Sequence, residues 1–253
     1  MRLWGFAVGL WLLSICTSYL LFHSQTVIAP MSLNLPTPPQ SDDEQSQSEW
    51  RQTVRRILLG WRSELDSVTH KNLSDQIRAH FDSFLSARRG ATVGFYWPIQ
   101  NEVDLRPVIT DHISKGGRAA LPVVPGRDMP MVFHDWTPDT VMTPGFARIP
   151  EPQDTPEIPV HVLLAPMVGF DRAGYRLGYG GGFFDRTLAA MTRKPLVVGI
   201  GFEATRLDDI KPHQYDVPVD VLITDAGTSV LSDAGEAAEN KPDQSSPPCH
   251  LCS

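Results

Sequence analysis

Between about residue 50 and residue 225, short segments rich in β-branched and aromatic residues alternate with segments whose apolar residues recur at helical spacing. This alternation predicts an α/β protein, in which helices cover both faces of a largely parallel open sheet in three layers. Ligands of such proteins bind at the carboxyl ends of the strands, so a site is expected in the loops that follow them. The strands are predicted at residues 91–97, 119–124, 131–133, 160–166, 196–201 and 219–224, and the helices at 50–65, 73–88, 103–115 and 184–191.

The two ends of the chain differ in composition from this block, which predicts one domain at residues 47–228. Residues 31–46 are polar and rich in proline and are expected to form a flexible leader, and residues 229–253 to form a disordered tail. All three cysteines, Cys16, Cys249 and Cys252, lie outside the block, so its core needs no disulfide. The lone Cys-x-x-Cys of the tail lacks the second pair of ligands that zinc sites usually have.

The first thirty residues are hydrophobic, and the stretch from Leu3 to Phe22 contains no charged residue. It is long enough to span a bilayer. Two interpretations stay open: an uncleaved membrane anchor, or a start codon placed too early, with the protein beginning at Met31. The second is favoured, and membrane association is left open. The net charge of −7 argues against general binding of nucleic acids, which requires a basic surface.

A glycine-rich stretch, Arg176-Leu-Gly-Tyr-Gly-Gly-Gly-Phe-Phe-Asp-Arg186, precedes the last predicted helix. Glycine permits positive φ and lets a ligand approach the backbone closely. The first amides of a helix point outward, and the helix dipole there favours an anion. The stretch matches neither the Walker pattern nor the dinucleotide fingerprint, and by itself it could also be a tight turn before a closely packed helix.

The charged residues that flank the glycines favour a phosphate site. Arg176 supplies a fixed positive charge suited to phosphate, and Asp185 is an oxygen ligand placed where a magnesium ion bound to that phosphate would lie. Further upstream, Arg51, Arg55 and Arg62 fall within an arc of roughly 40° beside the apolar stripe of the first helix. This line of cations either covers the core with its side-chain stems or faces an anionic ligand.

Four motifs in order resemble the 5-formyltetrahydrofolate cyclo-ligase family, whose members are also called methenyltetrahydrofolate synthetases. Arg176 to Leu188 resembles the glycine-rich signature, Tyr96 to Pro107 the folate-side loop, Leu163 to Asp171 the strand that leads into the glycine loop, and Pro212 to Asp220 the closing motif. Together they cover nearly all of the predicted domain, and their order and spacing make the resemblance specific.

The resemblance implies a fold like that of NagB and RpiA, and an ATP- and Mg²⁺-dependent reaction. In this reaction, 5-formyltetrahydrofolate cyclises to 5,10-methenyltetrahydrofolate, with release of ADP and phosphate. ATP is then a co-substrate and Mg²⁺ the cofactor, and polyglutamylated folates are also candidate substrates. No protein nucleophile is expected, because this chemistry depends on positioning and charge stabilisation. The resemblance also implies a cytoplasmic monomer or weak oligomer.

Carried over by position, the resemblance implies three sets of site residues. ATP is expected to contact Arg51, Arg55, Arg176, Leu177, Gly178, Tyr179, Gly180, Gly181, Gly182, Phe183 and Phe184. The folate substrate is expected to contact Trp97, Glu102, Tyr179, Gly180, Gly181, Gly182 and Phe183. Asp185 and Asp216 are expected to hold Mg²⁺.

The chain departs from the family pattern in three places. Arg51 replaces a lysine, and Phe183-Phe184 lacks the hydroxyls of the usual Tyr-Tyr or Phe-Tyr pair. Tyr215 stands where a histidine usually precedes the last aspartate. The alternative to an active enzyme is therefore a non-catalytic paralogue that binds folate or nucleotide.

Overall fold

The computed structural model describes residues 33–40, 43–233 and 235, which contain a seven-stranded mixed sheet. Five central strands run parallel, and an antiparallel strand pairs at each edge. In spatial order the strands are β11 (Gly227–Val230), β10 (Val221–Thr224), β9 (Leu196–Ile200), β6 (Val162–Pro166), β1 (Thr92–Gly94), β2 (Arg118–Val123) and β3 (Val132–Trp136). The predicted α/β class with a largely parallel sheet is confirmed.

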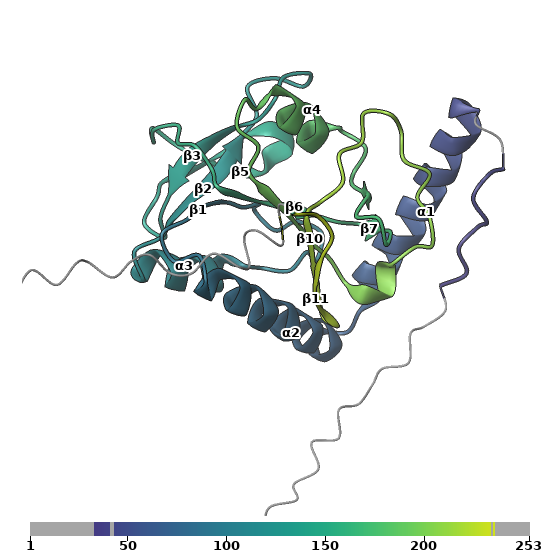
Figure 1. Cartoon of the computed structure of the whole chain (residues 1–253), viewed down its shortest axis with the longest axis horizontal. Coiled ribbons are helices and arrows are strands. Elements are labelled where there is room, and N and C mark those ends of the chain that lie inside the picture. The colour runs from purple at the N-terminus through teal and green to yellow at the C-terminus, as the bar shows by residue number, and fades with distance from the viewer. Residues whose placement is uncertain (1–32, 41–42, 234, 236–253) are drawn as a thin grey trace, which may run out of the picture. The chain divides into compact units, whose positions relative to one another are not determined.

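Helices cover both faces of this sheet, as the three-layer prediction requires (Figure 1). α2 (Ser67–Ser86) and α3 (Arg106–Ser114) pack on one face, and α4 (Phe183–Ala190) packs on the other. α1 (Glu44–Glu64) instead packs with the hairpin of β7 (Gly169–Phe170) and β8 (Arg176–Leu177). The remaining elements are the pair β4 (Met142–Pro144) and β5 (Pro150–Pro152) and the 3-10 turns η1 (Phe146–Arg148) and η2 (Glu203–Thr205).

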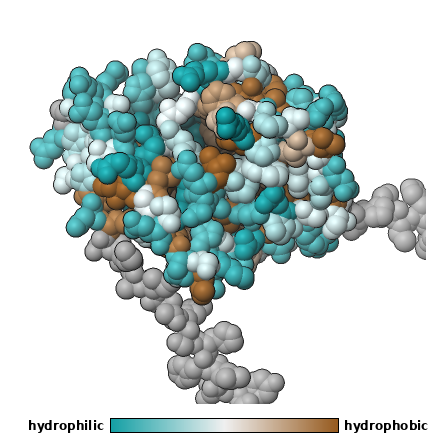
Figure 2. Space-filling model, turned by 180° about the vertical axis from the view of Figure 1, so that it is seen from behind, coloured by the Kyte–Doolittle hydropathy of each residue, from teal (hydrophilic) through white to brown (hydrophobic). Residues whose placement is uncertain are grey.

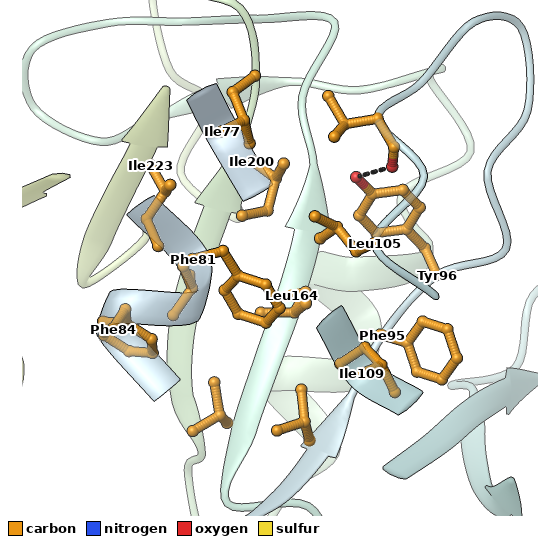
Figure 3. Close-up of a cluster of buried hydrophobic side chains, with 14 of the residues drawn as sticks. Ile77, Phe81, Phe84, Phe95, Tyr96, Leu105, Ile109, Leu164, Ile200 and Ile223 are labelled. Carbon is orange, nitrogen blue, oxygen red and sulfur yellow. Dashed lines mark hydrogen bonds between the residues drawn. The ribbon is translucent and has the colours of Figure 1, made fainter. Parts of the chain in front are cut away.

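Alternate residues of the central strands point into two separate cores. Leu164 of β6 packs with Phe81 of α2 and Ile109 of α3, in the cluster drawn in Figure 3. Its neighbour Leu163 belongs to the opposite cluster, with Leu188 of α4. This alternation is the two-residue period of a strand that is buried on both faces. On the face seen in Figure 2, hydrophobic side chains form separate patches among hydrophilic ones.

Leu164→Ala is expected to lower the free energy of unfolding by about 2–5 kcal/mol. The side chain is fully buried in the central strand, so its removal loses transfer free energy and leaves a cavity. Urea denaturation of the two proteins measures the change. Val68→Ala is the matched control, because that side chain is 65% exposed. Equal midpoints for Leu164→Ala and wild type would contradict the assigned core.

The structure corrects several predicted boundaries. α2 begins at Ser67, ahead of the expected 73–88 segment, because Asp66 caps it by accepting hydrogen bonds from the amides of Val68 and Thr69. α3 begins at Arg106 and not near residue 103, since the carboxylate of Asp104 accepts the Arg106 amide. β3 is longer than the expected 131–133 segment and runs antiparallel to β2. The edge strand β11 and the two small hairpins were missed.

The strand order places a topological switch between β1 and β6. After β1 the chain forms β2 on one side, and it later returns to form β6 on the other side of β1. Connections diverge at such a point and leave a crevice at the carboxyl ends of the two strands. Residues 95–105 follow β1, and the β7–β8 hairpin with the glycine loop follows β6, so both predicted halves of the site begin here.

Part of the expected leader lies against the domain. Leu33 and Leu35 pack against the α1 cluster, and the indole Nε1 of Trp50 donates to the carbonyl oxygen of Pro36 at 2.8 Å. None of the helices in the described ranges has the length and apolar character of a bilayer span. The hydrophobic stretch from Leu3 to Phe22 and the Cys249–Cys252 tail lie outside those ranges.

Candidate active site

The glycine loop leads into α4, as predicted, and connects this helix to β8, and its backbone is open to solvent. Gly180, Gly181 and Gly182 are exposed. Gly180 has φ +89° and Gly182 has φ +64°, a region that favours glycine. No side chain caps the N-terminus of α4, so its first amides are free of a side-chain acceptor. This arrangement offers backbone donors and the positive end of the helix dipole to an anion.

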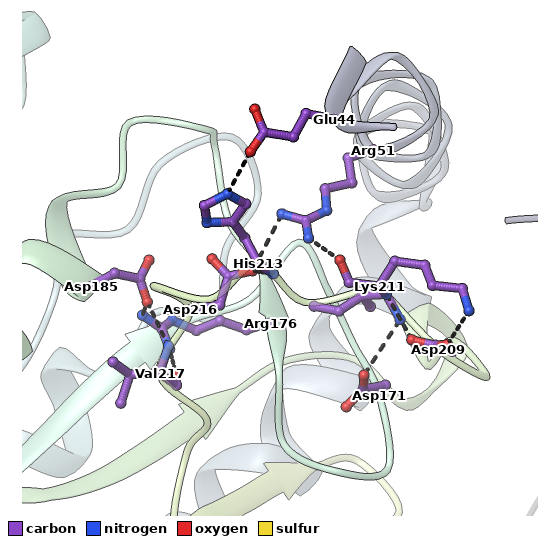
Figure 4. A network of polar contacts seen from close by, with 11 residues as sticks. Glu44, Arg51, Asp171, Arg176, Asp185, Asp209, Lys211, His213, Asp216 and Val217 are labelled. Carbon is purple, nitrogen blue, oxygen red and sulfur yellow. Dashed lines mark hydrogen bonds and ion pairs between the residues drawn. The ribbon is translucent and has the colours of Figure 1, made fainter. Parts of the chain in front are cut away.

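Arg176 holds two parts of the site together and is largely buried. One Nη donates to the carboxylate of Asp185 at 2.8 Å, and the other donates to the carbonyl oxygen of Val217 (Figure 4). The Val217 amide donates to the same Asp185 oxygen at 3.1 Å. The Arg176 side chain is only 6% exposed. Arg176 therefore orients Asp185 and the turn at Val217, and its predicted contact with phosphate stays a prediction.

Asp216 lies in that same turn and meets α1. Its Oδ2 accepts from Arg51 at 3.3 Å and from the His213 amide at 2.7 Å (Figure 4). Arg51 also donates to the carbonyl oxygen of Lys211. Asp216 thus fixes a turn, and its other oxygen accepts no hydrogen bond within the described ranges.

The two predicted metal ligands are brought together, because the residue next to Asp216 donates directly to Asp185. Each carboxylate uses one oxygen in protein contacts. Over the described residues, no group of three or more His, Cys, Asp or Glu side chains could enclose a metal. Mg²⁺ usually binds one or two carboxylates together with substrate phosphates, not a cage made only of protein. The pair fits that mode of binding.

Arg55 connects α1 to the glycine loop. Its Nε donates to the carbonyl oxygen of Gly178 at 2.5 Å. A Cβ on Gly180 would lie 3.5 Å from its guanidinium carbon, so the loop backbone passes directly along the arginine. Burial lowers the pKa of Arg55, and the positive charge of Arg51 lowers it further. A negatively charged ligand would relieve both effects.

Glu102 is buried at the folate side of the predicted site, with 7% of its surface exposed. Its two oxygens accept from the Tyr179 hydroxyl at 2.8 Å and from the Ile99 amide at 2.9 Å. It makes no capping hydrogen bond to α3, whose N-cap is Leu105. Burial raises the pKa of Glu102, and its hydrogen bonds with Ile99 and Tyr179 oppose that rise. Burial also raises the pKa of Tyr179, whose hydroxyl therefore stays protonated and donates.

Trp97 borders a cavity of about 400 Å³ between the loop after β1, the start of α3 and the end of β3. Trp136 and Met142 line it from the opposite side. The Arg106 guanidinium stacks 4.5 Å from the centre of the Trp97 ring and pairs with Asp104. Trp136 also packs edge-on against Phe95 in the core.

The remaining residues of the predicted ATP set differ in which of their groups could face a ligand. The Leu177 side chain is buried in the α1 cluster, so only its backbone can face a ligand. Phe183 packs edge-on against Phe146 at 5.1 Å between ring centres, and the Arg186 guanidinium lies 4.9 Å from its ring. Phe184 lies 5.7 Å from the Arg176 guanidinium. The rings that replace the usual hydroxyls are thus held by aromatic and cation–π contacts.

Sequence reasoning assigned no site role to two residues that shape this region. Arg62 donates to the Tyr179 hydroxyl at 2.6 Å, and its membership in the arginine line was the available signal. Asp171 is buried and accepts amide hydrogen bonds from Ala173 and Tyr175, which shapes the turn between β7 and β8. No sequence pattern distinguished Asp171 from other aspartates in turns.

Comparison with known proteins identifies the family of this domain. The family model described as the 5-formyltetrahydrofolate cyclo-ligase family matches residues 47–225. The chain belongs to this family. The 5-formyltetrahydrofolate cyclo-ligase of Haemophilus influenzae is 26% identical over 181 residues, which cover 68% of this chain and 97% of that protein.

Two solved structures of cyclo-ligase relatives resemble the fold. The 5,10-methenyltetrahydrofolate synthetase of Aquifex aeolicus gives a TM-score of 0.64 at 28% identity, covering 72% of this chain and 93% of that one. The synthetase of Mycoplasma pneumoniae gives 0.57 at 26% identity, covering 69% and 98%. These cyclo-ligases share the domain formed by the sheet and its helices.

Proposed function

We propose that this cyclo-ligase converts 5-formyltetrahydrofolate and ATP to 5,10-methenyltetrahydrofolate, ADP and phosphate. One observation carries the proposal beyond family membership. The glycine loop contacts both predicted half-sites, since Gly178 accepts from Arg55 and the next residue, Tyr179, donates to Glu102. A loop in this position brings a nucleotide phosphate and a folate ring next to each other, as transfer between them requires.

The nucleotide half-site is assigned to the exposed backbone of Gly180 to Gly182, the first turn of α4, and the arginines of α1. The amides and the helix dipole bind the triphosphate, and Arg51 and Arg55 neutralise its charge. Asp185 and Asp216 would hold Mg²⁺. When bound, the ion would neutralise charge on the phosphate oxygens during transfer.

The folate half-site is assigned to Glu102, Tyr179 and Trp97. Ionised Glu102 still has lone pairs beyond those used by Ile99 and Tyr179, and these can accept hydrogen bonds from the ring nitrogens and amino group of the pterin. Trp97 offers an apolar surface at the mouth of the adjoining cavity. Polyglutamylated forms remain candidate substrates.

The reaction proceeds in two steps. The formyl oxygen attacks the γ-phosphorus of ATP, the bond to the β-phosphate oxygen breaks, and ADP is released. N10 then attacks the formyl carbon and loses its proton, and the carbon–oxygen bond breaks as phosphate leaves. The protein supplies positioning and positive charge, in keeping with a site built of arginines and backbone amides.

In the direct test, the purified full chain is incubated with 5-formyltetrahydrofolate, ATP and Mg²⁺, and the absorbance of the methenyl product is measured over time. Product that depends on ATP supports the proposal. Binding of folate without product would instead support the non-catalytic paralogue, for which Phe183-Phe184 is the motive. As an ATP-using enzyme, the protein is expected on the cytosolic side, as a monomer or weak oligomer.

A further inference from the structure

The third arginine of the α1 line, Arg62, reaches the folate half-site. Arg62 is only 3% exposed, and such burial is rare for an arginine without compensating partners. One Nη donates to the Tyr179 hydroxyl at 2.6 Å, and the guanidinium carbon lies 5.9 Å from the centre of the same ring. Over the described ranges, no carboxylate lies within ion-pair distance of Arg62. The hydrogen bond from Arg62 to the site is therefore made to the tyrosine.

The direction of these hydrogen bonds is fixed by chemistry. A guanidinium can only donate, so the Tyr179 oxygen accepts from Arg62, and the single hydroxyl proton is left for Glu102. The Ile99 amide holds the other Glu102 oxygen. The result is a relay from α1 through the glycine loop to the loop after β1, and it holds the carboxylate at both oxygens.

Arg62 lines a small cavity beside the relay and has a buried polar atom without a partner. Arg62, Glu102 and Tyr96 line this space of about 10 Å³, which is near the minimum for one water molecule. The Nε of Arg62 is buried and has no hydrogen-bond partner among the described residues. Packing alone would not need such a group, because Trp50, Val54 and Leu58 already dock α1 on the β7–β8 hairpin.

We propose that Arg62 is a positioning residue of the folate half-site, which fixes the Tyr179 hydroxyl so that this hydroxyl orients Glu102 toward the pterin. The inference rests on the proposed function. It separates the arginine line into two roles: Arg51 and Arg55 serve the nucleotide, and Arg62 serves the folate. Loss of Arg62 should therefore weaken folate binding selectively.

The charges around Glu102 give a second readout. It faces Arg62 of α1, Tyr179 of the glycine loop, and Tyr96 after β1. Burial raises the pKa of Glu102, and the positive charge of Arg62 opposes that rise. Without this charge the carboxylate should protonate at a higher pH. The KM for folate, which depends on ionised Glu102, should then begin to rise at a higher pH as the solution is acidified.

The test compares Arg62→Gln, Arg62→Lys and the matched control Arg56→Gln, an exposed arginine of the same helix. Arg62→Gln should raise the KM for 5-formyltetrahydrofolate about tenfold, which corresponds to the loss of roughly one hydrogen bond to a charged donor. The KM for ATP should stay within about twofold of the wild-type value. Arg62→Lys should show the wild-type pH profile, because lysine keeps the positive charge. Its KM for folate should lie between those of wild type and Arg62→Gln, because lysine lacks the planar geometry of the guanidinium. Arg56→Gln should match wild type.

Equal changes in both KM values, or a lower unfolding midpoint with unchanged folate KM, would overturn the inference. If Arg62→Gln does not fold, Tyr179→Phe interrupts the same relay, and an unchanged folate KM in that variant would refute it. Absence of turnover by wild type refutes the proposed function instead. Calorimetric titration with 5-formyltetrahydrofolate then decides the role of Arg62: the inference expects about tenfold weaker binding by Arg62→Gln, and equal affinities refute it.

Discussion

Asp185→Asn is expected to lower kcat by about 100-fold or more, because it removes the negative charge that we propose would bind Mg²⁺ beside the nucleotide phosphates. The amide keeps nearly the same shape. Its oxygen can still accept from Arg176 and from the Val217 amide, as the carboxylate does. The variant therefore changes the charge of the site while keeping its hydrogen-bond geometry.

The same substitution should destabilise the protein only modestly. Arg176 is buried and loses its charged partner, which is expected to lower the free energy of unfolding by about 1–3 kcal/mol. Kinetic assays at saturating ATP and folate, together with urea denaturation, separate the two effects. Asp75→Asn is the control, since Asp75 pairs with Lys71 and Arg78 on the surface of α2. Near-normal turnover with a much lower unfolding midpoint would show that Asp185 is structural.

Glu102→Gln is expected to lower kcat/KM for 5-formyltetrahydrofolate by about 10- to 100-fold and to leave the KM for ATP nearly unchanged. The neutral amide of glutamine has one oxygen acceptor where the carboxylate has two. Hydrogen bonds from the pterin to a charged acceptor are therefore lost, which costs about 1.5–3 kcal/mol of binding free energy. Steady-state kinetics with each substrate varied in turn measure this. Glu49→Gln, on the exposed side of α1, is the control. Equal losses for the two substrates would argue against a folate-specific role.

The pH dependence of the wild-type enzyme follows from the same carboxylate. Because burial raises the pKa of Glu102, its ionised form is lost as the pH falls, and this loss begins at a higher pH than for an exposed glutamate. The KM for folate should therefore rise on acidification, and the rise should be absent in Glu102→Gln. A folate KM that follows the same pH profile in both proteins would contradict this assignment.

Most of the architecture could be predicted because its signals are local. The alternation of apolar segments placed the five parallel strands and four helices, and glycine spacing located the loop before α4. The small hairpin of β7 and β8 could not be predicted, because each of its strands has only two residues, which is too short to show an alternating pattern. Strand β11 pairs with β10 through four residues, of which two are exposed and none is buried, and they carry no apolar pattern.

The sequence indicated which residues would gather near the glycine loop better than it indicated which atoms they would contact. Periodicity placed Arg51, Arg55 and Arg62 on one side of a helix. No sequence pattern indicated that each of them hydrogen-bonds to a different residue across the site. Arg176 shows the limit most clearly. Its position beside the glycines indicated phosphate, whereas in the structure its guanidinium holds Asp185 and the Val217 carbonyl. Long-range pairings of this kind depend on the tertiary fold.

The central claim is that this chain uses ATP to activate the formyl oxygen of its folate substrate. Turnover of 5-formyltetrahydrofolate carrying ¹⁸O in the formyl group tests it most directly, with mass analysis of the released phosphate. We expect one labelled oxygen in each inorganic phosphate formed, in step with the methenyl product. Methenyl product accompanied by unlabelled phosphate would contradict the account, because the formyl oxygen would then have left by another route.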